Sequence, residues 1–145
     1  MIEAVEKKIS EILKDKKDLS IKIEKNQRDN DQLLDEVFLE AISVLDVFSR
    51  EEKIIEDKGW NLSDDSQKAI KRLLNAKKKL NTMLEKYNVQ KITFENSMSH
   101  DDLCSIIDTE PDSENPNGFI LSIEKEGYTR NGHLLRRAEV VIVKN

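Results

Sequence analysis

Residues 118–143 decide the fold of the C-terminal part of the chain, and they read G-F-I-L-S-I-E-K-E-G-Y-T-R-N-G-H-L-L-R-R-A-E-V-V-I-V. Phe119, Leu121 and Ile123 alternate with Ile120, Ser122 and Glu124, and a continuous β-branched run follows at residues 140–143. Both patterns are typical of β-strands. Between them, Asn131-Gly132 indicates a type I′ turn, because both central residues of that turn need positive φ. The stretch therefore predicts a β-hairpin within a small β-rich module.

The residues just upstream extend this module. Residues 89–94 read as an extended connector, and residues 103–107 read as a further strand. An acidic run follows, D-T-E-P-D-S-E-N-P-N-G, in which two prolines and a closing glycine predict an irregular loop. We therefore expect residues 91–145 to form a β-rich domain.

The N-terminal part of the chain carries a heptad repeat of apolar residues, which predicts one long helix over residues 1–57. So narrow an apolar stripe needs a partner helix, and the pattern indicates a coiled coil. Asn30 falls on the seam and favours a parallel dimer, because a buried Asn pair penalises other registers. The alternative is that the seam frays between Lys16 and Asn30.

From Leu33 onward a second apolar face appears, so this part of the helix must contact more than one neighbour. Gly59 is a natural C-cap for the long helix, and Ser63 or Asp64 is a suitable N-cap for a second helix that ends near Tyr87. Residues 58–90 thus form a loop and a short amphipathic helix. Two copies of both helices predict a four-helix bundle in a homodimer. The expected dimer interface consists of Ile9, Ile12, Leu19, Ile23, Asn30, Leu33, Val37, Val44, Val47, Ile70, Leu73 and Leu80.

The predicted fold class is therefore α+β: a long N-terminal coiled-coil helix, a short bundle helix and a small C-terminal β-rich domain. Composition limits the functions that this fold can carry. The net charge is −5, and lysines are interleaved with acids, which disfavours nucleic-acid binding. The sequence shows neither a signal peptide nor a membrane span, and Cys104 is the single cysteine. These features predict a cytoplasmic protein.

No group of residues predicts catalysis, a metal site or a cofactor. The alternating acids of the loop lack the sixth-position Gly and the flanking helices of an EF-hand, so a solvated loop is favoured. His100 and Cys104 lack the further ligands of a zinc site, and Cys104 lies in an apolar run where an inert buried thiol is expected. Phosphate-binding loops and nucleophile elbows are absent from the sequence. The prediction is a protein that is not an enzyme.

A recognition surface is predicted in the hairpin instead. Basic residues gather there beside apolar ones, as is common in interfaces. The basic cluster consists of Arg130, His133, Arg136 and Arg137. The apolar residues expected to be core are Tyr128, Leu135, Ala138 and Val140.

The same residues carry a resemblance to a known family. Gly127-Tyr128, Asn131-Gly132, Leu135-Arg136, Ala138, Val140 and Ile142 resemble the C-terminal signature of the GrpE family, nucleotide-exchange factors of DnaK-type chaperones. The resemblance implies a parallel homodimer whose β-domain holds open the ATPase domain of the chaperone so that ADP leaves, in protein folding and the stress response. It implies no cofactor. The partner-binding residues that it implies are Phe94, Tyr128, Arg130, Asn131, Gly132, His133, Arg136 and Ile142.

The sequence departs from the family pattern at several positions. His133 stands where the family usually has Arg or Lys, Arg137 where Pro or a small residue is common, and Glu124 where the residue is often apolar. In the segment that opens the β-domain, Asn96 replaces Pro and Ser99 replaces His. The alternative function is a homodimeric coiled-coil scaffold whose β-domain docks another protein without exchange activity.

Overall fold

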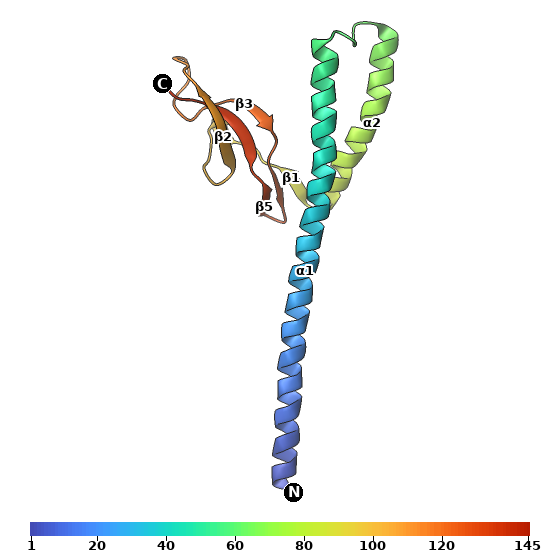
Figure 1. The fold of residues 1–145 in the computed structure, drawn as a ribbon, viewed down its shortest axis with the longest axis vertical. Helices are drawn as coiled ribbons and strands as arrows, with labels where there is room; N and C mark the ends of the chain where they lie inside the picture. Colours follow the sequence, from blue (N-terminus) through green and yellow to red (C-terminus); the bar gives the residue numbers. More distant parts are fainter. The chain divides into compact units, whose positions relative to one another are not determined.

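The computed structural model describes residues 1–145, in which two helices precede a β-rich region (Figure 1). The predicted α+β order is confirmed. Its elements are α1 (Ile2–Asp57), α2 (Asp64–Lys86), β1 (Val89–Lys91), the 3₁₀ helix η1 (Glu95–Ser97), β2 (Cys104–Glu110), β3 (Ile120–Lys125), β4 (Tyr128–Arg130), β5 (His133–Arg136) and β6 (Ala138–Val143).

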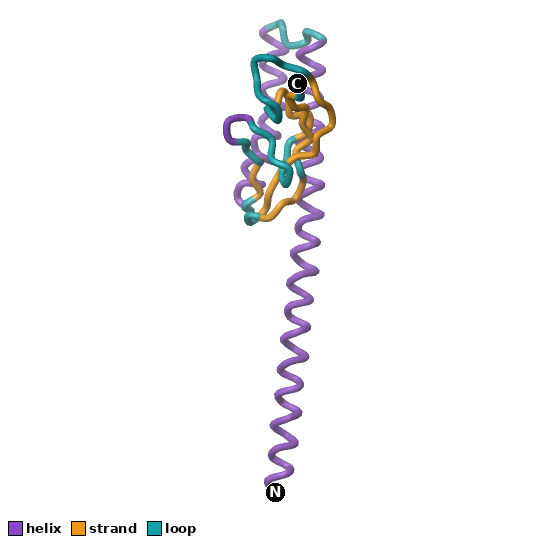
Figure 2. The backbone as a smooth tube through the Cα atoms, turned by 90° about the vertical axis from the view of Figure 1, so that its left-hand side faces the viewer, coloured by secondary structure: helices purple, strands orange, loops and turns teal.

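Local sequence signals set the helix boundaries. Helix α1 is 56 residues long, and Figure 2 shows it as an unbroken helix, including residues 16–30. It ends in a Schellman motif: Gly59 has φ +66, its N–H donates to Glu56 O at 3.1 Å, and Trp60 N–H donates to Ile55 O at 3.0 Å. Helix α2 begins after Ser63, whose Oγ accepts a hydrogen bond from Ser66 N–H at 3.2 Å. The predicted caps are therefore confirmed.

The chain forms two compact units, Met1–Val37 and Phe38–Asn145. The first unit consists of helix alone and contains no buried side chain. The second contains the C-terminal part of α1, helix α2 and all of the strands. Within it, Lys77 on α2 pairs with Glu52 on α1, so the two helices lie side by side.

The β-rich region contains two three-stranded sheets, ordered β1-β4-β5 and β2-β6-β3. Strands β4 and β5 form the predicted hairpin, with Asn131 at φ 50 and Gly132 at φ 82 in its turn. Strands β3 and β6 also pair antiparallel, while β2 runs parallel to β6. The sequence did not predict that the β-rich region is divided into two sheets: the hairpin leaves the sheet of β3 and β6 and joins β1.

Strand β2 corrects a second expectation. It continues through Glu110, so Asp108 and Glu110 belong to a strand and not to the acidic loop. Pairing with β6 extends to Glu110 opposite Val143. The acidic side chains remain exposed along this edge strand, so their charges stay in water and pay no desolvation cost.

Two hydrophobic clusters stabilise the unit Phe38–Asn145. The helix-side cluster joins Phe38, Ile42, Leu45, Leu84, Val89 and Tyr128. The sheet cluster joins Cys104, Ile120, Ala138, Val140 and Ile142, with Phe94 packed against it. Cys104 is therefore the buried free thiol that the sequence predicts.

Gly127 lies where the chain passes from one sheet to the other. A Cβ atom there would lie 2.6 Å from the backbone N of Ala138 and 2.8 Å from Cδ1 of Ile92. The Gly127 carbonyl accepts a hydrogen bond from Ile92 N–H at 2.8 Å. Only glycine allows the backbones to approach so closely.

Candidate functional site

The tip of the β4–β5 hairpin is the most exposed part of the predicted recognition surface. Asn131, Gly132 and His133 are all exposed. The backbone N–H of Asn131 donates to Asn88 O at 3.1 Å, which ties the tip to the turn after α2. The tip is therefore a turn fixed by a backbone hydrogen bond, with the side chains of Asn131 and His133 at the surface.

Arg130 occupies a different environment from the tip. The residue is only 4% exposed, and its guanidinium carbon lies 5.9 Å from the centroid of the Phe38 ring. A cation over an aromatic face is attracted to the ring quadrupole. The expectation that Arg130 belongs to a basic rim was therefore wrong as to its placement, because Phe38 and the helix-side cluster cover it.

Arg136 is also engaged within the chain. Its Nη1 donates to Asp46 Oδ2 at 2.6 Å and its Nη2 to Asp46 Oδ1 at 2.9 Å, a bidentate pair between β5 and α1. Its Nε and Nη2 also donate to Glu126 O at 3.0 and 2.7 Å. The guanidinium lies 5.6 Å from the centroid of the Tyr128 ring. Of the predicted basic cluster, His133 and Arg137 are the exposed members.

The remaining residues of the predicted surface are parts of the two cores. Tyr128 is buried in the helix-side cluster, and this burial, followed by the negative charge of Glu126, raises the pKa of its hydroxyl. Ile142 and Phe94 belong to the sheet cluster. The structure thus brings Tyr128, Arg130 and Arg136 together on the side that faces the helices, and it does not join them to Phe94 and Ile142 in one exposed patch.

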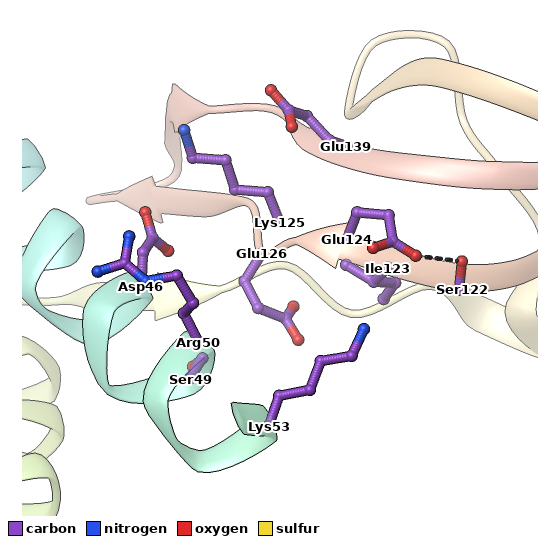
Figure 3. Close-up of a pocket in the computed structure, with 10 residues that line it drawn as sticks. All are labelled: Asp46, Ser49, Arg50, Lys53, Ser122, Ile123, Glu124, Lys125, Glu126 and Glu139. Atoms are coloured by element: carbon purple, nitrogen blue, oxygen red, sulfur yellow. Dashed lines mark hydrogen bonds between the residues drawn. The ribbon is translucent and has the colours of Figure 1, made fainter. Parts of the chain in front are cut away.

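A groove between α1 and the β-rich region was not predicted from the sequence (Figure 3). Its volume is about 650 Å³, and most of its lining side chains are charged. Glu124, one of the departures from the family pattern, lies in it and accepts a hydrogen bond from Ser122 Oγ at 2.8 Å. The lining residues are Asp46, Ser49, Arg50, Lys53, Ser122, Ile123, Glu124, Lys125, Glu126 and Glu139.

The acidic loop closes on its own polar groups. Asp112 accepts hydrogen bonds from Asn115 Nδ2 at 2.7 Å and from Glu114 N–H at 2.9 Å, and these bonds lower the pKa of its carboxyl. Asn145 holds the same loop through Asp112 N–H at 2.8 Å. No three His, Cys, Asp or Glu side chains come together as a metal site requires. No helix is long and apolar enough to cross a bilayer.

The residues predicted to form a dimer interface lie largely on the surface of the chain. Ile9, Ile12, Leu19, Ile23, Leu33, Val37, Val44, Val47 and Leu73 are exposed large apolar residues, and Asn30 is exposed as well. Val44, Val47, Ile70 and Leu73 line an almost entirely apolar groove of about 300 Å³ between α1 and α2. Leu80 differs, because it packs against the helix-side cluster.

These features define a class of proteins: a long helix, a helix packed back against it and a small β-domain held by both. Compared with known protein families, the chain matches the GrpE family over residues 1–144. It belongs to the GrpE family, and no curated protein matches it. At the level of the family, membership supports a nucleotide-exchange co-chaperone of DnaK-type chaperones rather than a catalytic enzyme.

Proposed function

We propose that this protein is a homodimeric nucleotide-exchange factor that promotes ADP release from a DnaK-type chaperone. The observation that carries the proposal is the family match over residues 1–144. The protein acts by population shift, because it binds the open conformation of the ATPase domain more tightly than the closed one. It needs no cofactor and performs no covalent step.

Three segments divide this work in the proposal. Residues 1–57 dimerise as a coiled coil, residues 58–90 complete a four-helix bundle, and residues 91–145 contact the chaperone. The apolar groove between α1 and α2 supports the bundle, since most of its lining side chains are apolar: Val44, Val47, Phe48, Ile55, Ile70, Leu73 and Leu74. A second copy of the same two helices offers the apolar side chains that such a groove needs.

Direct contact with the chaperone is assigned to the hairpin tip, Asn131, Gly132 and His133. Their exposure supports this assignment. Phe94, Tyr128, Arg130, Arg136 and Ile142 contribute by holding the sheets that present the tip. The buried free thiol of Cys104 is compatible with action in a reducing compartment such as the cytoplasm.

The test is the release rate of a fluorescent ADP analogue from each DnaK-type ATPase domain of the host, with and without the protein. We expect an acceleration of more than about tenfold with the wild type and a clear loss with His133→Ala. His100→Ala is the matched control, because His100 is an exposed histidine outside the hairpin. A folded dimer that accelerates release from none of the ATPase domains would favour the scaffold alternative.

A further inference from the structure

The guanidinium of Arg136 joins three parts of the chain: its own strand β5, helix α1 and the connection between β3 and β4. It binds Asp46 on α1, 90 residues away, and the Glu126 carbonyl in the connection between β3 and β4. The two side chains of the ion pair are 17% and 32% exposed, so water screens this pair less than an ordinary surface pair. Bidentate arginine–carboxylate pairs fix geometry as well as contributing energy.

These contacts lie where the chain crosses between its two sheets. Residues 126 and 127 lead from β3 in one sheet to β4 in the other, and residue 137 leads back from β5 to β6. Arg136 contacts the first crossing through Glu126 and immediately precedes the second. The guanidinium thus connects both crossings to α1.

Asp46 also lines the charged groove between α1 and the β-rich region, opposite Glu124 and Lys125 (Figure 3). A rotation of the sheets that widens this groove would move Arg136 away from Asp46, because Asp46 lies on α1 and Arg136 on β5. The pair therefore restrains the direction in which the β-domain faces, independently of what the β-domain binds.

We propose that Arg136 and Asp46 form a clamp that holds the β-domain in one orientation on α1, and that Arg136 serves exchange through this clamp rather than through contact with the chaperone. The second part of the proposal rests on the proposed function. A factor accelerates release only by the difference between its affinities for two chaperone conformations. A rigid surface fits the open conformation alone, whereas a surface that swings adapts to both.

Loss of the clamp is therefore expected to lower the coupling and to leave affinity nearly unchanged. The variants are Arg136→Lys, which keeps the charge but removes the planar fork, and Asp46→Asn, which keeps the shape but removes the charge. Lys144→Ala is the matched control, because Lys144 is an exposed cation of the β-domain that lies outside the hairpin and its recognition surface. ADP release is measured over a range of concentrations of the factor.

Both clamp variants are expected to lower the maximal acceleration at least about fivefold while the half-saturating concentration changes by less than about twofold. Lys144→Ala is expected to behave as the wild type. An unchanged maximum with a raised half-saturating concentration would overturn the proposal, because a contact residue or a residue needed only for folding gives that pattern.

A second measurement tests the clamp without the chaperone. Spin labels at Ser49→Cys on α1 and Ser105→Cys on β2, both exposed positions, report the distance between helix and sheet in a Cys104→Ala background. Labelled protein is mixed with excess unlabelled protein, so that a dimer carries labels on one subunit only and the distance is measured within that subunit. We expect one narrow distance distribution for the parent and for Lys144→Ala, and a broader one for Arg136→Lys.

Equal widths in all three proteins would overturn the clamp. If the parent protein fails to accelerate ADP release from any ATPase domain, the proposed function fails, and the width of the distance distribution still decides whether the clamp exists.

Discussion

The two parts of α1 share one helix and one apolar repeat, yet they differ in what surrounds them. In Met1–Val37 no side chain is buried, and the seam residues are exposed along the whole unit. In residues 38–57, Phe38, Ile42 and Leu45 are buried against α2, β1 and β4. The repeat alone therefore does not determine which residues find partners within the chain.

The difference shows where each part obtains its stability. Residues 38–57 bury apolar surface against their own chain, at about 25 cal/mol for each Å² removed from water. An isolated helix gains no such term, and in proteins most of the stability of a helix comes from the packing of its apolar face. The proposed homodimer would supply the missing burial to Met1–Val37, so the two parts should respond differently to substitution and to dilution.

The largest difference is expected between two isoleucines of α1. Ile42 is 0% exposed and Ile12 is 55% exposed. Ile42→Ala should lower the free energy of unfolding of the unit Phe38–Asn145 by about 3 kcal/mol, because it leaves a cavity in the helix-side cluster. Ile12→Ala should change that free energy by less than about 0.5 kcal/mol. Urea unfolding followed by near-UV circular dichroism, to which the buried Tyr128 contributes, measures both, and equal losses would contradict the comparison.

The next effect concerns the seam. The double variant Leu19→Asp plus Ile23→Asp places charges on the stripe and should weaken the homodimer at least about a hundredfold, which corresponds to about 2.7 kcal/mol. Sedimentation equilibrium measures the dissociation constant. Lys17→Asp plus Lys25→Asp is the control, since these exposed lysines lie at heptad positions away from the seam and its flanks. An undiminished dimer in the seam variant would remove the assignment of Met1–Val37 to dimerisation.

A smaller effect is expected at Arg130, which covers Phe38 from the β4 side. Arg130→Ala should cost about 2 kcal/mol, because it removes a buried cation over a ring and opens the helix-side cluster. Arg137→Ala, on the exposed side of the same hairpin, should cost less than about 0.5 kcal/mol. Thermal unfolding of the two variants side by side checks this. If Arg130→Ala unfolds at the same temperature as the wild type, the stability of the helix-side cluster does not depend on Arg130.

The smallest effect is a pH dependence. Because burial raises the pKa of Tyr128 in the folded state, its contribution to stability is complete below the unfolded-state pKa of about 10 and is lost as the pH rises through the higher folded-state value. Tyrosine titrates over roughly pH 9.5 to 11. Over this range the free energy of unfolding should therefore fall less in Tyr128→Phe than in the wild type. Tyr87→Phe is the control, because Tyr87 is exposed. Parallel losses in all three proteins would show that Tyr128 is not responsible.

The sequence predicted those features whose causes are local. Gly59 and Ser63 act through hydrogen bonds within a few residues, so the ends of α1 and the start of α2 were predicted closely. Asn131-Gly132 likewise determines its own turn. The division into two sheets was missed, because the partner of a strand depends on residues far away in the chain, as when Val89 pairs with Arg130.

The candidate site was predicted only in part for the same reason. Arg130 and Arg136 stood out as charges in an apolar context, and the sequence does not show that Phe38 and Asp46, in a helix far upstream, are their partners. The one signal in the sequence for the Arg136 pair was Asp46, an acidic residue next to the buried Leu45 on α1. The roles of the exposed tip and of the seam remain predictions, since both depend on a second molecule.

The close approach at Gly127 has a consequence for how members of this family can diverge. The carbonyl of Arg136 and the backbone N of Ala138 lie within about 3 Å of where a Cβ of Gly127 would stand, so the hairpin starts and finishes at almost one point. A segment whose two ends adjoin in this way can vary in length without moving the strands on either side of it. Its turn can be lengthened, shortened or replaced while β3 and β6 keep their pairing, which lets the protein acquire a new specificity without redesigning its frame.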